Sequence, residues 1–215
     1  MIITFQNFLL SLAQGQLKNI AAADKSQGGY IKPDYIDTFL KLTNQGLLDL
    51  TTKKKLFEET AILTLVTGQN IYPLDTSNGA DFENMVRVID VVTDDERSHT
   101  TKTSVHIRQP NPETLRFSDT FIDYYGANID INFQVHHPLI LSDGEINLPA
   151  HLHEVLALYV SGLYLAHMGG EEHKVLGDSL YGLYLKKCND DTIENSSNLS
   201  EVTDEDSRFY DRGFI

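Results

Sequence analysis

The fold of this chain is decided by residues 149–188, which read PAHLHEVLALYVSGLYLAHMGGEEHKVLGDSLYGLYLKKC. Apolar residues recur there at helical spacing, first over residues 152–164 and again over residues 176–184. Gly169-Gly170 interrupts this pattern, and Pro149 stands where the first turn of a helix would begin. Because the connection is short, the stretch predicts two helices packed as an antiparallel hairpin.

The helical spacing also predicts which side chains of the hairpin are buried. The first helix carries small residues that would let another backbone approach closely, namely Ala157, Ser161, Gly162 and Ala166. The apolar stripe of the first helix is Leu152, Val155, Leu156, Tyr159, Val160, Leu163 and Tyr164. For the second helix the expected stripe is Leu176, Leu180, Leu183 and Tyr184.

The N-terminal part of the chain is also expected to be helical. Thr4 is a suitable N-cap for a short helix that Gly15 would end. Residues 21–29 are expected to be a loop, and Pro33 would lie in the first turn of a long second helix. Lys53-Lys54-Lys55 would close that helix, because cations are favourable at a helix C-terminus; the alternative is an anion or nucleic-acid patch.

The middle of the chain reads as β-structure. Residues 59–66 are rich in β-branched side chains and are expected to form a strand. The chain is expected to turn at Gly68 and to return as a second strand at 71–74. This second strand should lie at a sheet edge, because Pro73 cannot donate a hydrogen bond. The best period-2 signal is residues 128–135, with Ile129, Ile131, Phe133 and Val135 on one face. Further strands are expected at 85–92, 103–108 and 114–117, with residues 109–112 separating the last two.

Taken together, these patterns predict an α+β protein. A discontinuous helical core would comprise residues 1–57 and 146–189, with N-terminal helices and the C-terminal hairpin. An antiparallel β-rich lobe, residues 58–145, would be inserted between its two parts. Residues 190–215 would form a flexible acidic arm, because Asp and Glu interleaved with Asn and Ser bury too little apolar surface to fold alone.

Charge and composition narrow the classes of function. The chain of 215 residues has 17 basic and 31 acidic residues, a formal net charge of −14. This balance argues against specific nucleic-acid binding, which relies on clustered Lys and Arg. No apolar run of membrane-spanning length and no signal-peptide pattern are evident. The single cysteine, Cys188, suits a reducing compartment such as a cytoplasm, and is expected to be a partly buried apolar residue.

Residue types that could carry chemistry do not form a recognisable set. On a helix, His151 and His153 point about 200° apart, so they cannot share one metal ion. Phosphate-loop, dinucleotide-binding and nucleophile-elbow motifs are all missing. The other grouped histidines are His136, His137, His167 and His173. We therefore expect no catalytic residue, no metal and no cofactor, and no enzyme activity.

The C-terminal end carries an aromatic cluster after the acidic stretch. A solvated tail does not need such residues, so we expect them to dock on a partner, with folding back onto their own domain as the alternative. The expected partner-binding residues are Arg208, Phe209, Tyr210, Arg212, Phe214 and Ile215.

The order of these segments resembles one family. The relevant stretches are residues 29–33 leading into 42–50, the strand pair around 67–75, and Leu148 through the Gly169-Gly170 break to Tyr184. In this order the chain is similar to the head-to-tail adaptor proteins of tailed bacteriophages, podovirus type. The resemblance covers most of residues 1–188, and the long section at 75–145 departs from a compact adaptor.

The resemblance implies a structural virion protein at the head–tail junction, made in the host cytoplasm. Copies of the chain, usually twelve, would form a ring on the portal protein and extend the DNA channel toward a tail tube or nozzle protein. Genomic DNA would pass without specific binding, and no membrane would be involved. The C-terminal arm would insert into the portal or a neighbouring subunit.

Two other readings remain open on the sequence. One is a non-viral scaffold or regulatory binding subunit that uses the aromatic C-terminal arm. The other is a hydrolase or transferase whose site is assembled from scattered His and Asp residues.

Overall fold

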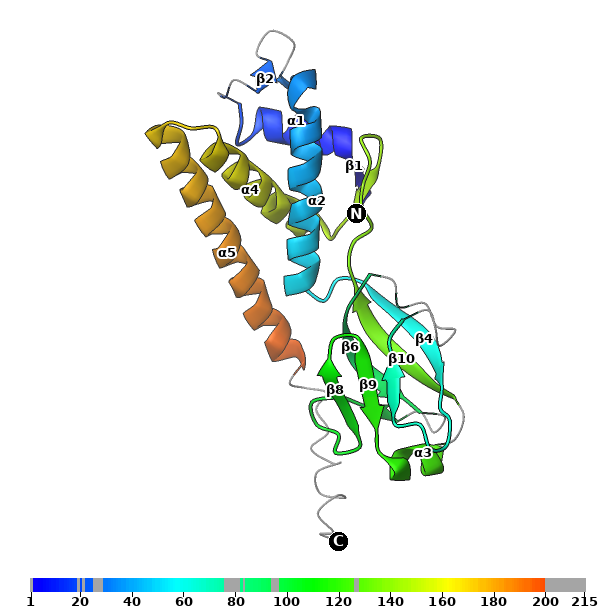
Figure 1. Cartoon of the computed structure of the whole chain (residues 1–215). Helices are drawn as coiled ribbons and strands as arrows, with labels where there is room; N and C mark the ends of the chain where they lie inside the picture. The colour runs from blue at the N-terminus through cyan, green and yellow to red at the C-terminus, as the bar shows by residue number, and fades with distance from the viewer. Residues whose placement is uncertain are drawn as a thin grey trace. The chain divides into compact units, whose positions relative to one another are not determined.

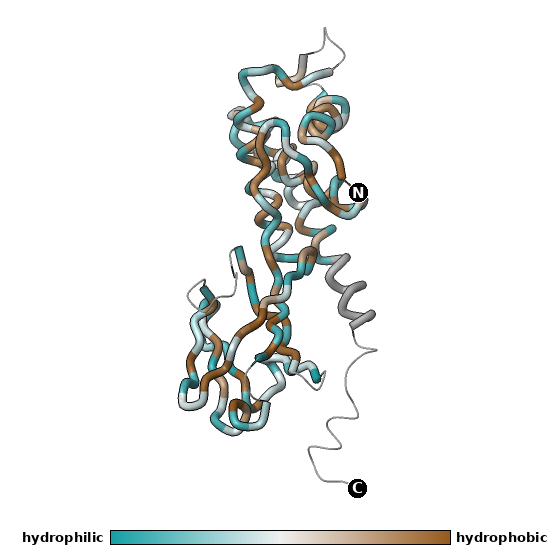
Figure 2. Tube along the Cα trace, turned by 90° about the vertical axis from the view of Figure 1, so that its right-hand side faces the viewer, coloured by the Kyte–Doolittle hydropathy of each residue, from teal (hydrophilic) through white to brown (hydrophobic). Residues whose placement is uncertain are grey.

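The computed structural model describes residues 2–18, 20, 22–24, 29–75, 82, 84–93, 97–125 and 128–199. These residues form α-helices and antiparallel β-sheets, so the chain has the mixed α+β composition expected from its sequence (Figure 1). It divides into two units, Met1–Gly46 with Ile140–Ile215 and Leu47–Leu139. Hydrophobic segments occur along the helices and along the strands (Figure 2).

The first unit begins with a small sheet and a capped helix. Strand β1 (Ile2–Thr4) pairs antiparallel with β11 (Glu145–Asn147), a pairing that the sequence analysis did not anticipate. Helix α1 (Phe5–Gln14) follows directly, and the Thr4 side chain accepts a hydrogen bond from the backbone N–H of Asn7. At the other end the N–H of Gly15 donates to the Ser11 carbonyl. Both predicted ends of this helix are confirmed.

Two short strands follow α1. Strands β2 (Ala23–Asp24) and β3 (Tyr30–Ile31) pair antiparallel, so the prediction of a loop over residues 21–29 is wrong for its strand residues. Ala23 and Ile31 are both buried and lie opposite each other in this pairing, so they form a stabilising cross-strand apolar pair. The segment is rich in Gly and Ala, which is why its sequence does not predict strands.

The long second helix starts with a tight turn. A 3-10 turn (Pro33–Tyr35) leads into α2 (Ile36–Lys53), and Pro33 lies in the first turn as predicted. Phe39, Leu47 and Leu50 are fully buried, whereas Leu48 is exposed. The helix crosses the boundary between the two units at Gly46.

The predicted hairpin consists of α4 (Ala150–His167) and α5 (Glu171–Leu199). Pro149 is the residue just before α4, with extended backbone, and Gly169 and Gly170 join the helices with positive φ angles of 77° and 88°. Helix α5 continues beyond Asp190, where the sequence predicts the arm to begin. Extending an existing helix costs little compared with starting one, so polar residues can be added to its end.

The second unit contains a four-stranded antiparallel sheet in the order β4-β10-β6-β7. Its strands are β4 (Glu58–Thr64), β6 (Met85–Val92), β7 (Ser98–His99) and β10 (Asn128–Val135). Strand β10 lies between β4 and β6, and the four side chains predicted on its inner face, Ile129, Ile131, Phe133 and Val135, are all buried. The prediction for this strand is confirmed.

A second, three-stranded sheet has the order β5-β9-β8, with β5 (Ile71–Pro73), β8 (Ile107–Asn111) and β9 (Thr114–Phe117). Pro73 lies in an edge strand as predicted. However, β5 pairs with β9 and not with β4, the strand before it. The prediction that residues 71–74 return alongside the preceding strand is therefore wrong. The Gly68 turn, with φ of 87°, instead carries the chain from one sheet to the other.

Strand β8 also differs from the prediction. It begins at Ile107 and includes Pro110, which was expected to separate two strands. Since β8 is an edge strand with a register shift after Arg108, the missing proline N–H is tolerated. A short helix, α3 (Asp119–Tyr125), follows β9 and was not expected.

The two sheets of the second unit share one hydrophobic core. Phe117 of β9 stacks on Phe121 of α3 with 5.3 Å between ring centroids, and Phe82 lies 5.1 Å from Phe133 of β10. Tyr72 of β5 contacts Phe117 edge to face. The buried apolar side chains of both sheets therefore belong to a single hydrophobic cluster. In the part of the chain that the structure describes, the helices lack the combination of length and hydrophobicity that crossing a membrane requires.

Candidate docking surface

The histidines do not come together as a metal site. Within the described ranges, no group of three or more His, Cys, Asp or Glu side chains could hold an ion. His136 hydrogen-bonds Thr51, and the His137 ring meets Phe57 edge to face. Burial lowers the pKa of His136, His137 and His153, which favours the neutral ring in the folded protein.

A network of polar side chains caps the C-terminal end of α2 within the second unit. Gln134 of β10 is fully buried, and its side-chain amide donates to the carbonyls of Thr51 and Lys54, the latter at 2.7 Å. Arg87 holds the other end of this amide, with Nε donating to Oε1 at 2.9 Å. Free carbonyls at a helix end need such donors. The network is a structural cap for α2.

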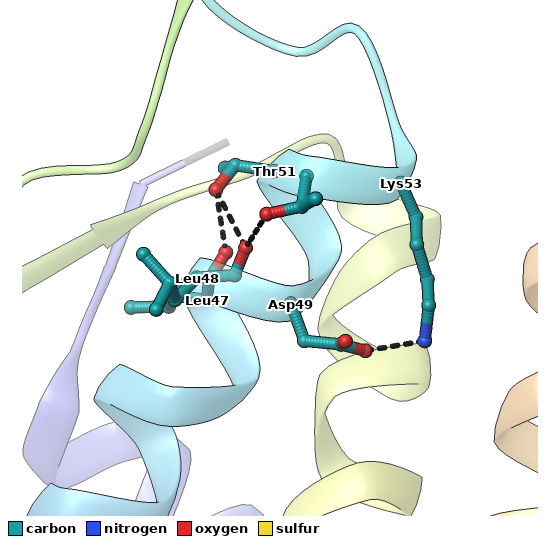
Figure 3. A network of polar contacts seen from close by, with 6 residues as sticks. Leu47, Leu48, Asp49, Thr51 and Lys53 are labelled. Carbon is teal, nitrogen blue, oxygen red and sulfur yellow. Dashed lines mark hydrogen bonds and ion pairs between the residues drawn. The ribbon is translucent and has the colours of Figure 1, made fainter. Parts of the chain in front are cut away.

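Two of the three lysines predicted at this helix end, Lys53 and Lys55, pair with nearby carboxylates. The Lys53 ammonium lies 2.6 Å from the Asp49 carboxylate. Figure 3 shows this pair beside the hydrogen bonds from the Thr51 hydroxyl to the carbonyls of Leu47 and Leu48. Lys55 pairs with Glu58 at 3.0 Å, and Lys54 is buried. These contacts favour the helix-end interpretation over an anion-binding patch.

The α4–α5 hairpin is held by very close backbone packing. A Cβ atom placed on Gly177 would lie 2.7 Å from the Gly162 carbonyl oxygen and 2.6 Å from the Ala166 backbone nitrogen. Farther along, the rings of Tyr159 and Tyr184 meet at 5.0 Å. Contacts thus run in opposite directions along the two helices, which is the antiparallel arrangement. Glycine at the crossing is required because any larger residue would separate the helices.

Helix α4 is buried on nearly all sides. A Cβ on Gly46 of α2 would lie 2.7 Å from Leu156 and 2.8 Å from Tyr159 side-chain atoms, and the Tyr164 ring lies 4.6 Å from that of Phe39. On the other side α4 packs on α5, so α4 lies between the two helices in this unit (Figure 1). The buried residues of α4 include the whole predicted stripe except Leu163, which is half-buried.

Helix α5 turns inward a face that includes only part of the predicted stripe, Leu180 and Tyr184. Over residues 171–189, where burial is described, Gly177, Tyr184 and Cys188 are buried, and Leu180 and Tyr181 are partly covered. The predicted stripe residues Leu176 and Leu183 are instead 43 % and 46 % exposed. The sequence pattern failed here because α5 has apolar residues on two sides, and only the side with Gly177 allows close contact with α4. Cys188 is buried, more deeply than expected.

The outward side of α5 is therefore an apolar surface exposed to solvent. Val175 is 64 % exposed, and together with Leu176 and Ser179 it lines a shallow open pocket bordered by Glu171 and Glu172. Leu183 continues the surface one turn farther on. We call this surface the outer α5 face; its residues are Glu172, Val175, Leu176, Ser179, Gly182, Leu183 and Lys186. Exposed apolar side chains gathered on one helix mark an interaction site more often than scattered ones do.

The outer α5 face was missed by sequence reasoning, which assigned its leucines to the core. One signal could have separated the two faces, namely the spacing of Gly162 and Gly177 on the facing sides of the hairpin.

The residues predicted to dock on a partner, Arg208, Phe209, Tyr210, Arg212, Phe214 and Ile215, lie outside the described residues. Neither the models of known protein families nor the curated protein sequences include a match to this chain.

Proposed function

We propose that this chain is a structural head-to-tail adaptor of a tailed bacteriophage. Copies of it would form a ring beneath the portal protein, join the capsid vertex to the tail and extend the channel through which the genome passes. In this proposal the helical segments form the core of each subunit, the β-rich segment is a lobe inserted into it, and the C-terminal arm docks on the portal or on a neighbouring copy.

The observation that carries the proposal is the length of α5. The helix has 29 residues, which corresponds to about 43 Å from the Gly169-Gly170 loop to its end. Its first half is fixed to α4 by the Gly162–Gly177 contact, and the aromatic residues 208–215 come shortly after its last residue. A long helix that is followed closely in the sequence by an aromatic segment suits a subunit that connects two assemblies.

The net charge of −14 supports the same role. A channel protein must let a polyanion slide past it, and an acidic surface repels phosphate groups instead of holding them. The described lysines at the end of α2 do not form an exposed basic patch, since Lys53 and Lys55 pair with carboxylates and Lys54 is buried.

A scaffold or regulatory subunit is the second candidate, and the outer α5 face favours it as much as it favours an adaptor. That surface fits any partner with a complementary helix or groove, viral or not. The two proposals differ in stoichiometry, because an adaptor forms a ring on a portal and a scaffold forms a small complex of fixed composition.

The test is electron microscopy of this protein mixed with the portal protein encoded in the same genome. We expect class averages with an added ring of density on one face of the portal. The same mixture made with a chain that lacks residues 208–215 should leave the portal bare. Portal particles without added density in the first mixture would overturn the adaptor proposal and favour a scaffold.

A further inference from the structure

We infer that the outer α5 face binds the same face of a second copy of this chain, with the two α5 helices antiparallel and related by a two-fold axis at Ser179. This pairing is a property of the free protein and goes beyond the proposed adaptor role. A ring is built from two different surfaces on each subunit, whereas a two-fold pair uses one surface twice. A copy whose outer α5 face is paired therefore cannot use that face in a ring contact at the same time.

The first argument is the shape of the surface. With about 100° of rotation per residue, all residues of the outer α5 face lie within about 60° of Ser179 around the helix axis. The buried residues Gly177, Tyr184 and Cys188 and the partly covered Tyr181 lie on the opposite side, against α4. The apolar residues Val175, Leu176 and Leu183 thus form one continuous strip without a partner inside their own unit among the described residues.

The second argument is that the strip is symmetric about Ser179. Val175 and Leu183 lie at equal distances before and after it, as do Leu176 and Gly182. In an antiparallel pair centred on Ser179, Val175 of one copy therefore lies opposite Leu183 of the other at both ends. Each copy covers the exposed apolar side chains of its partner with apolar side chains of its own.

The third argument is charge complementarity. Glu172 and Lys186 also lie at equal distances from Ser179, about 10 Å on either side along the axis. Antiparallel pairing places each Glu172 opposite the Lys186 of the other copy, which gives two ion pairs at the ends of the strip. A parallel pair would place like charges together. The order of charges along the outer α5 face therefore selects a second copy in the antiparallel direction.

The centre of the strip also allows two helices to approach closely. Ser179 has a small side chain, and a Cβ atom on Gly182 would meet nothing within 4 Å. Small residues at a crossing point bring helix axes to the short end of the usual 8–10 Å range. The contact is limited to one helix from each copy, so we expect a reversible dimer and not a permanent one.

The first experiment is sedimentation equilibrium of the full chain alone, up to about 0.5 mM. We expect a monomer–dimer equilibrium that weakens about tenfold in Glu172→Lys and in Lys186→Glu, because each creates two like-charge contacts per pair. The double variant, Glu172→Lys with Lys186→Glu, should recover dimerisation. Asp178→Lys and Lys174→Glu make the same charge changes away from the strip and should dimerise like the natural chain.

The second experiment tests the position of the axis. Ser179→Cys places one thiol from each copy at the two-fold axis, so oxidation should cross-link most of the dimer. Asp178→Cys, on the flank of the same helix, should cross-link several-fold less. A monomer at all concentrations, a charge-swapped double variant that stays monomeric, or equal cross-linking at both positions would each overturn the proposal. None of these measurements uses a portal, so the adaptor proposal can fail or succeed independently.

Discussion

Gly162 of α4 and Gly177 of α5 face each other so closely that neither position has room for a side chain. A Cβ on Gly162 would lie 2.9 Å from the Tyr181 backbone nitrogen, and one on Gly177 would lie 2.6 Å from the Ala166 backbone nitrogen. Both neighbours are backbone atoms, which cannot move aside as a flexible side chain can. The contact fixes which side of α5 is buried and leaves the outer α5 face free.

Gly177→Ala is expected to destabilise the protein by about 1–3 kcal/mol, because the added methyl group forces the helices apart. Gly182→Ala is the matched control on the same helix, and it should be neutral or stabilise by up to about 1 kcal/mol through its higher helix propensity. Urea unfolding at low protein concentration measures both changes. Equal stability of the two variants would contradict the close-packing account.

Leu156→Asp is expected to prevent folding or to cost more than about 3 kcal/mol, because it buries a charge without a partner in the most enclosed helix of the unit. Leu176→Asp makes the same chemical change on the outer α5 face, where water can solvate the carboxylate. Circular dichroism during heating compares the two. A folded Leu156→Asp variant as stable as Leu176→Asp would show that α4 is not buried.

Gln134→Ala removes both side-chain donors from the end of α2 and leaves the carbonyls of Thr51 and Lys54 buried without them. We expect a loss of about 1–3 kcal/mol in the free energy of unfolding. Asn132→Ala, in the same strand but hydrogen-bonded to exposed Thr60, is the control and should cost much less. Chemical denaturation of both variants at neutral pH decides the question.

Acid is expected to destabilise the fold through His136, His137 and His153, whose charged forms are disfavoured by partial or full burial. The pKa values of His136, His137 and His153 are lowered from 6.5 by burial, so below that pH the unfolded chain binds protons that the folded chain does not. Stability should therefore be constant above about pH 7 and fall as the pH drops below 6.5, until it reaches the folded-state pKa values. His137→Gln should flatten the pH dependence of the free energy of unfolding, with the exposed His151→Gln variant as the comparison.

Removal of residues 208–215 is expected to leave the melting temperature unchanged within about 1–2 °C, because the α4–α5 hairpin and the described sheets are formed without them. The same truncation should abolish binding to the portal protein. Calorimetry and a portal pull-down measure the two properties. A large drop in melting temperature would instead show that this segment folds back on its own domain, the alternative considered from the sequence.

The local signals in the sequence determined much of the secondary structure. Thr4 and Gly15 specify the ends of α1, Pro33 and Pro149 mark helix starts, and the alternation in residues 128–135 specifies a strand and its buried face. These features depend on the residue itself or on its near neighbours, through backbone geometry and hydrogen bonding. Such local signals are sufficient to predict these features without knowledge of the rest of the chain.

Only the tertiary structure decided which strands pair and which helix face is buried. Strand β5 could pair with β4 or β9, and the choice depends on burying Tyr72 against Phe117, which is distant in the sequence. Helix α5 is apolar on two sides, and hydrophobic spacing alone assigned Leu176 and Leu183 to the wrong one. The side with Gly177 is the buried one, because only there can the backbones of α4 and α5 come into contact. Dispersion and apolar burial between the two helices need this close approach.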